Sequence, residues 1–270
     1  MRRTILVGVL ALLVTQAAPA AATTRPTLYL AMGDSLAVGD GASVQSETGY
    51  VGLLTDYFAG TPHGNAKDAR NISVGGETTG SFLAGQANAA VATILDPSTD
   101  VTVVTVSISG NDLLNLLNEP GDPCVINPGS ADCQILLATA LGGVAASYPT
   151  VMGTLSWALA QDPGAERVFV LTLYNPFGGT GSPYEVPIDY ALLGVDLAID
   201  CAAAQVNPMA AGLNDIVACT SWAFGATVVD GYAVIGDNAL ALTHIGDPGF
   251  NIHPNDEGYA AIAKAHRRAW

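Results

Sequence analysis

The 270-residue chain is 50% hydrophobic and only 12% charged, and its formal net charge is −15. This composition excludes a disordered chain, and the length is sufficient to bury a sizeable core. Because a strongly acidic surface repels phosphate groups, we expect neither nucleic acid nor anionic lipid as a partner.

The first 22 residues have the pattern of a secretory signal peptide. Arg2 and Arg3 give a positive start, residues 5–14 are almost entirely apolar, and residues 18–22 contain two small-x-small cleavage patterns. A membrane anchor is the alternative, but the apolar run is roughly half of what a bilayer crossing needs. No later segment is expected to be long and apolar enough. We therefore expect an extracellular protein without a stable membrane anchor.

Stretches typical of strands and of helices alternate along the remaining chain. Short β-branched or apolar runs predict strands at 27–32, just before residue 71, at 101–108, at 167–173 and at 226–229. Helical spacing of apolar residues predicts helices at 50–58, 80–95, 135–161, 189–204 and 257–269, with Pro149 as a candidate break. Continuously apolar strands alternating with helices predict a three-layer α/β/α sandwich with a mainly parallel sheet.

Four cysteines, Cys124, Cys133, Cys201 and Cys219, lie after the leader, where oxidation is permitted. Of the three possible pairings we favour Cys124 with Cys133 and Cys201 with Cys219, because each pair falls within one connecting region. Loops that short would each contribute roughly 2–3 kcal/mol. A zinc site is the rival interpretation, but no C-x-x-C or close Cys/His spacing supports it. We expect no metal.

Polar signatures occur where predicted strands end and just before the last helix. They are Gly-Asp-Ser-Leu at 33–36, Asn-Ile-Ser-Val-Gly-Gly-Glu-Thr at 71–78, Ser-Gly-Asn-Asp at 109–112 and His-Pro-Asn-Asp-Glu-Gly-Tyr at 253–259. Each alone is typical of a helix cap or a turn. In parallel sheets, however, ligands bind beyond the carboxyl ends of the strands. These segments are therefore the places to look for chemistry.

Acyl transfer to a serine requires an exposed hydroxyl, a base and donors aimed at the oxyanion. Ser35 can supply the hydroxyl, and His253 can accept its proton because an imidazole titrates near working pH. The backbone N–H groups of Ser35 and Gly76 and the side-chain amide of Asn111 can supply the donors.

Other candidate residues lack such a setting. His63, His244 and His266 are interpreted as structural or surface residues. The segment Asn71-Ile72-Ser73 matches a glycosylation sequon, which we discount because it lies in a turn that has a functional character.

In this order, the four signatures resemble four blocks of the SGNH hydrolases, the GDSL esterase/lipase family. The second block looks like the family's Asn-x-x-x-x-Gly pattern, which places the oxyanion glycine at Gly76 rather than at Gly75. The resemblance covers essentially the whole chain after the leader, so we expect residues 23–270 to form a single domain of this type. It implies a flavodoxin-like sandwich, no cofactor, and hydrolysis of esters or related acyl bonds.

One position departs from the family's pattern. The family commonly has an Asp three residues before the histidine, where this chain has Phe250; Asn251 lies nearer and Asp247 further back. In serine proteases, replacing that Asp by Asn costs about 10⁴ in turnover. Three alternatives follow: Asp247 folds back to His253, a main-chain carbonyl orients the ring, or the enzyme is weak. Asn251 itself is the remaining candidate partner.

The sequence thus predicts a secreted serine esterase or lipase, monomeric, that acts on a small-molecule, lipid or carbohydrate ester. The alternative is a carbohydrate- or surface-binding module that kept the fold and lost catalysis. Residues 118–133 and 174–190 are candidates for the wall of an acyl pocket. Nothing in the sequence selects an acyl-chain length.

Overall fold

The computed structural model describes residues 25–60, 62–117, 120–162, 164, 166–195, 197, 199–202 and 210–270. The predicted signal peptide lies outside these residues. Within them, five parallel strands form one sheet in the order β2-β1-β3-β4-β5. The strands are β1 (Thr27–Gly33), β2 (Asp68–Asn71), β3 (Asp100–Ser107), β4 (Arg167–Leu171) and β5 (Thr227–Val229). This is the doubly wound, flavodoxin-like order.

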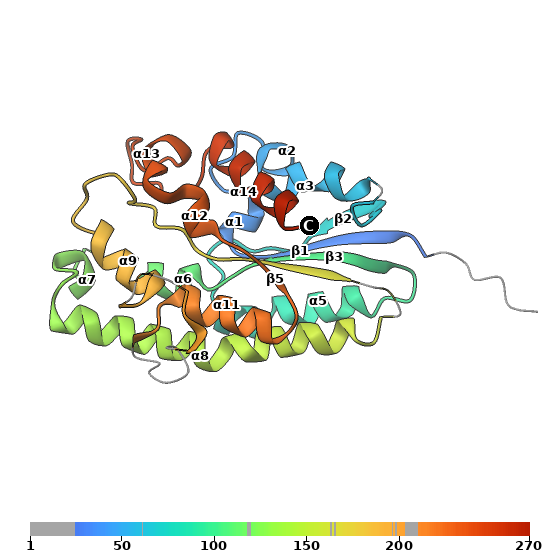
Figure 1. The fold of residues 1–270 in the computed structure, drawn as a ribbon, viewed down its shortest axis with the longest axis horizontal. Helices are drawn as coiled ribbons and strands as arrows, with labels where there is room; N and C mark the ends of the chain where they lie inside the picture. The colour runs from blue at the N-terminus through green and yellow to red at the C-terminus, as the bar shows by residue number, and fades with distance from the viewer. Residues whose placement is uncertain are drawn as a thin grey trace, which may run out of the picture.

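Helices cover both faces of the sheet, which confirms the predicted three-layer sandwich (Figure 1). One layer contains α1 (Ser35–Val38), α2 (Gln45–Thr48), α3 (Tyr50–Ala59), α12 (Gly231–Ile235), α13 (Ala239–Leu242) and α14 (Asp256–Ala269). The other contains α4 (Thr79–Ala84), α5 (Gln86–Ile94), α6 (Gly110–Leu114), α8 (Ala131–Leu159) and α11 (Leu213–Ala223). Two short helices, α7 (Pro123–Ile126) and α9 (Glu185–Leu193), lie near the strand ends.

The two layers enclose separate apolar cores on the two faces of the sheet. Alternate residues of the central strand β1 point into each: Leu28, Leu30 and Met32 on the α8 side, Tyr29 and Ala31 on the α14 side. Burial on both faces explains why β1 and β3 are almost continuously apolar. Gly33 of β1 pairs with Ser107 of β3, so these two strands end side by side at the same edge of the sheet.

The long helix α8 contains Pro149 without a break. Proline in a helix interior removes one backbone hydrogen bond and usually costs about 3 kcal/mol. The helix continues because Tyr148, Val151 and Leu155 are buried in the core next to it. By length and composition α8 could also cross a membrane, contrary to the expectation for segments after the leader. The core helices of globular proteins share this composition, and buried Val144, Tyr148 and Val151 pack one face of α8 against the core of the sheet.

Two predicted helices differ from the structure. The helix expected at 80–95 is divided at Gly85 into α4 and α5. The helix expected at 189–204 ends at Leu193, and part of that range lies outside the described residues. It ends there because Gly194 has a φ of 70°, and a Cβ at this position would lie 2.2 Å from the carbonyl oxygen of Ala210. A positive φ cannot continue a right-handed helix, and only glycine adopts this conformation readily.

Both favoured disulfides are present. Cys124–Cys133 joins α7 to the first turn of α8, and Cys201–Cys219 joins the segment after α9 to α11. Each bridge closes a short loop, with sequence separations of 9 and 18 residues. They fasten connections on the α8 side of the molecule.

Candidate active site

Ser35 is the first residue of α1, directly after the end of β1. Gly33 allows this turn: its φ is 133°, and a Cβ there would lie 1.9 Å from the carbonyl oxygen of Ser107. The buried carboxylate of Asp34 then caps α1, because Oδ1 accepts from the Leu36 N–H at 3.1 Å and from the Ser107 hydroxyl at 3.2 Å. Local backbone chemistry therefore holds Ser35 at the carboxyl edge of the sheet.

The imidazole of His253 lies against this serine, although 218 residues separate the two. Its Nε2 is 3.0 Å from Ser35 Oγ. Its Nδ1 is 2.8 Å from Asn251 Oδ1, and that same oxygen accepts the backbone N–H of His253 at 3.1 Å. A backbone N–H can only donate, so the contacting Asn251 atom is the acceptor and Nδ1 carries the proton. Nε2 is then free to accept the proton of Ser35.

Asn251 is thus the group that orients His253. Asp247 does not fold back to His253; its Oδ2 lies 2.6 Å from Nδ1 of His244. Burial lowers the pKa of His253, an effect that the charge of Asp40 opposes and that of His244 reinforces. The neutral ring, which is the form that acts as a base, is therefore favoured in the folded protein.

Asn111 and Gly76 lie together on neighbouring segments at the same edge. Nδ2 of Asn111, in the first turn of α6, donates to the carbonyl oxygen of Glu77 at 2.9 Å. An amide nitrogen has two hydrogens, so a second one remains for a ligand. Gly76 has a φ of 76° and open space where a Cβ would be. The loop before α4 is therefore exposed at Gly76, next to the Glu77 carbonyl that Asn111 contacts.

Two further side chains, Gln86 and Asp112, fix that loop; Asp112 belongs to the predicted signature at 109–112, whereas nothing in the sequence selects Gln86. Buried Gln86 accepts the Gly33 N–H at 2.6 Å through Oε1, while its Nε2 donates to Gly33 O and to Glu77 Oε2, each at 3.0 Å. Asp112 accepts from the backbone and the hydroxyl of Thr79, each at 2.9 Å. Gln86 thus joins the strand that precedes Ser35 to the loop that carries Gly76. Its position in an ordinary helical stretch carries no signal of this role.

A small, mainly apolar pocket opens beside the serine. Its lining includes Ser35, Asn111 and His253 together with Leu36, Leu114, Leu173, Tyr174, Pro176 and Ile252. The predicted wall at 174–190 therefore contributes Tyr174 and Pro176. Residues 118–133 contribute none of the described lining, and Gly76 lies outside it as well. Tyr174 is held by its hydroxyl, which donates to Ile252 O at 2.6 Å.

His266 and His63, interpreted from the sequence as structural or surface residues, both stack on tyrosine rings. His266 is fully buried and stacks on Tyr50 at 5.2 Å, and burial lowers its pKa to about 4. His63 stacks on Tyr57 at 4.1 Å. The sequon residue Asn71 uses its amide nitrogen as a donor to Ala37 O at 2.6 Å.

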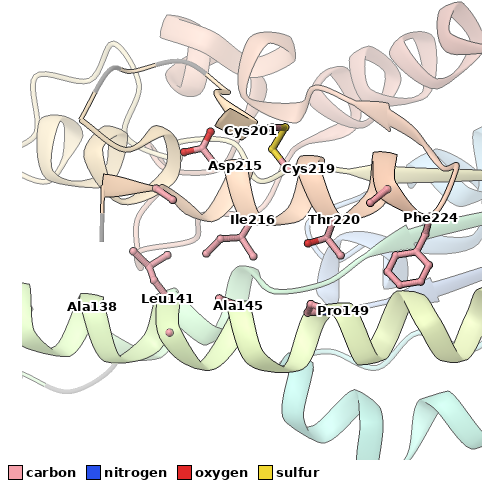
Figure 2. A pocket seen from close by; sticks show the side chains of 13 residues that line it. Ala138, Leu141, Ala145, Pro149, Cys201, Asp215, Ile216, Cys219, Thr220 and Phe224 are labelled. Carbon is pink, nitrogen blue, oxygen red and sulfur yellow. A yellow bond between two sulfur atoms is a disulfide. The ribbon is translucent and has the colours of Figure 1, made fainter. Parts of the chain in front are cut away.

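A larger groove lies between α8 and α11, away from the serine (Figure 2). Leu141 on α8 and Ile216 and Phe224 on the α11 side give it an apolar lining, next to the Cys201–Cys219 bridge. It contains no pair of nucleophile and base among the described residues. Likewise, the described ranges hold no cluster of three or more His, Cys, Asp or Glu side chains placed for a metal ion. The chemistry that the structure offers is at the smaller pocket.

Comparisons with known proteins address the family and the fold of the chain. The profile of the GDSL-like Lipase/Acylhydrolase family matches residues 31–261. The chain is similar in fold to an extracellular lipase from Streptomyces rimosus, with a TM-score of 0.57 and 23% identity over 90% of this chain and 100% of that one. A phospholipase A1 from Streptomyces albidoflavus NA297 gives 0.58 and 20% identity over 90% and 99%. No curated protein matches significantly.

A more distant similarity involves a catalytic mutant of an acetylxylan esterase from Geobacillus stearothermophilus. It has a TM-score of 0.51 and 14% identity, over 91% of this chain and 94% of that one. At such identities these solved structures establish the fold.

Proposed function

Because the chain belongs to the GDSL-like lipase/acylhydrolase family, we propose that it is a secreted serine esterase or lipase that cleaves carboxylic esters through an acyl-serine at Ser35. The observation that carries this proposal is the 3.0 Å contact between Ser35 Oγ and His253 Nε2. The Asn251 contact leaves Nε2 as the acceptor, so the pair is arranged for proton removal from the hydroxyl.

In the first half of the reaction, Ser35 Oγ attacks the ester carbonyl carbon while His253 Nε2 takes the hydroxyl proton. The carbonyl oxygen becomes an oxyanion, which Asn111 Nδ2 and the backbone N–H groups of Ser35 and Gly76 would stabilise. Collapse of this intermediate breaks the bond to the alcohol, and His253 returns the proton to the departing oxygen. The acyl group remains on Ser35.

In the second half, water attacks the acyl-serine carbonyl and gives its proton to His253 Nε2. Collapse releases the carboxylic acid and restores the Ser35 hydroxyl. Asn251 holds the ring orientation throughout, but its neutral amide stabilises the imidazolium less than a carboxylate does. We therefore expect slower turnover than an Asp at this position would allow.

The apolar lining next to Ser35 suits the acyl part of an ester. Leu114, Leu173 and Ile252 are among its apolar lining residues. The pocket is small, so we expect short acyl groups to react faster than long ones.

Secretion belongs to the same proposal. Two disulfides are typical of oxidising compartments, and the leader pattern of residues 1–22 predicts export of a domain comprising residues 23–270. One of the similar structures is itself described as an extracellular lipase.

The test is turnover of nitrophenyl esters of increasing acyl length by the wild type and by Ser35→Ala. We expect the variant to lose measurable turnover while its circular dichroism spectrum is unchanged. Ser46→Ala on α2, which replaces an exposed serine away from the pocket, should retain the wild-type rate. Wild-type turnover that survives in Ser35→Ala would overturn the assignment, and a folded wild type without turnover would favour the binding module.

A further inference from the structure

His244 lies in the segment between α13 and α14 that also contains His253, and both of its ring nitrogens face acceptors. Its Nδ1 is 2.6 Å from Asp247 Oδ2, and its Nε2 is 2.8 Å from the carbonyl oxygen of Gly41. A carboxylate and a carbonyl oxygen both lack a proton to donate. A neutral imidazole has one N–H and can satisfy only one of them. Only the doubly protonated ring makes both hydrogen bonds.

These contacts connect His244 to the proposed catalytic pair. The backbone N–H of His244 donates to the backbone carbonyl oxygen of His253 at 2.9 Å. This hydrogen bond lies next to an isolated antiparallel bridge between Thr243 and Pro254. Gly41 follows α1, the helix that begins with Ser35. A Cβ on Gly41 would lie 2.9 Å from His253 Cβ and 3.1 Å from His244 Cδ2. The backbone of Gly41 therefore packs against both histidine side chains.

We propose that His244 is a positioning residue, which Asp247 holds as an imidazolium. The hydrogen bond from His244 Nε2–H to Gly41 O keeps His253 in line with Ser35. The proposal rests on the proposed function, because His253 and Ser35 are taken as the reacting pair. His244 itself touches no reacting atom.

The charged groups around His244 favour the protonated ring. Asp247 on its own segment is the main cause of a raised pKa, and Asp256 at the start of α14 adds to it. Asp256 also accepts from the Ser43 N–H at 2.8 Å and from the Thr48 hydroxyl at 2.7 Å, so it holds the same loop that contains Gly41. From the other sides, Asp40 neighbours Gly41, and the cation of His244 lowers the pKa of His253.

The direction of the pH effect follows from these shifts. The raised pKa of His244 means that its two hydrogen bonds persist up to that pKa and that one is lost as the pH rises through it. The lowered pKa of His253 places the acid limb of activity below that point. We therefore expect a bell-shaped profile, in which His253 sets the acid limb and His244 the alkaline limb.

Asp247→Asn is the most informative variant, because it keeps the side-chain shape and removes the charge. It should lower the pKa of His244 and move the alkaline limb to lower pH by about one unit. His244→Gln, which cannot titrate, should abolish that limb and reduce kcat about tenfold with little change in KM. His63→Gln, which replaces the histidine stacked on Tyr57, should leave both limbs in place.

Nitrogen-detected NMR of the histidine rings provides the direct readout, and it works equally in inactive Ser35→Ala. We expect the pKa of His244 to lie above that of an ordinary histidine, with both ring nitrogens protonated below it, and to fall in Asp247→Asn. A His244 pKa that is not raised, or an alkaline limb that does not move in Asp247→Asn, would overturn the proposal. Absence of turnover in the wild type would instead overturn the proposed function, which keeps the two failures distinguishable.

Discussion

Two histidines in the segment before α14 differ in the partner of Nδ1 and in the main influence on their pKa, which is burial for His253 and Asp247 for His244. His253 contacts the neutral amide oxygen of Asn251 at 2.8 Å, whereas His244 contacts the carboxylate of Asp247 at 2.6 Å. The first keeps a low pKa and a free Nε2 next to Ser35; the second has a raised pKa and both nitrogens engaged. The comparison teaches that the carboxylate expected beside the base is present in the sequence but serves the other ring.

The largest effect should come from removing the base. His253→Ala should lower kcat/KM for a short nitrophenyl ester by about 10⁴-fold or more, since His253 Nε2 is the base that contacts Ser35 Oγ within the described part of the chain. The corresponding change His63→Ala is the control and should leave the rate unchanged. Similar losses of kcat/KM in both variants would mean that the loss in His253→Ala does not come from removing the catalytic base.

A smaller loss is expected from the oxyanion donor. Asn111→Ala removes the side-chain amide that contacts the 76–79 loop, and kcat should fall about 10²–10³-fold. KM should change much less, because the interaction develops in the transition state. Full activity of this variant would remove Asn111 from the mechanism.

Exchanging the partner of the base tests the comparison itself. Asn251→Asp gives His253 a carboxylate partner like that of His244, so the pKa of His253 should rise by about one unit. The acid limb of kcat/KM would then move to higher pH, because a neutral ring must be present to accept the proton. Above that limb the rate should increase about tenfold, since the carboxylate stabilises the imidazolium. An acid limb that stays in place would show that Asn251 does not control the ring.

The smallest effect should follow from loosening the oxyanion loop. Gln86→Leu leaves the Gly33 N–H without its side-chain acceptor and removes the link to Glu77, at a cost of about 1–3 kcal/mol in unfolding free energy. We expect kcat to fall several-fold through misplacement of Gly76. Gln134→Leu on exposed α8 surface is the matched control, and equal stability of the two variants in urea would contradict the bridging role.

Much of the fold could be predicted because strand and helix patterns are local. The runs at 27–32 and 101–108 are apolar on both faces, and they became the central strands β1 and β3. The helix α11 was not predicted. Its residues 213–223 mix buried Asn214 and Asp215 with apolar residues. Asn214 donates to the carbonyl oxygen of distant Leu173, and Asp215 accepts from the Gly212 N–H just before the helix. Such tertiary satisfaction leaves no periodic signal.

The candidate site divides in the same way. Ser35, Asn111 and His253 lie in short motifs with recognisable chemistry, and the structure brings all three to one pocket. The sequence left open which group orients His253. Asn251 is two residues away, and whether its side chain reaches the ring depends on how the backbone turns between them. Gln86 contacts Gly33 and His244 contacts Gly41, at sequence separations of 53 and 203 residues. No local sequence pattern indicates contacts of such long range.

The claim on which the account depends is that Ser35 is a nucleophile activated by His253. Labelling with a fluorophosphonate, followed by mass spectrometry of the digested protein, tests it directly. The account predicts a single phosphonyl adduct on the peptide that contains Ser35, formed much more slowly in His253→Ala. An adduct on another serine, or equal labelling rates in the two proteins, would contradict it.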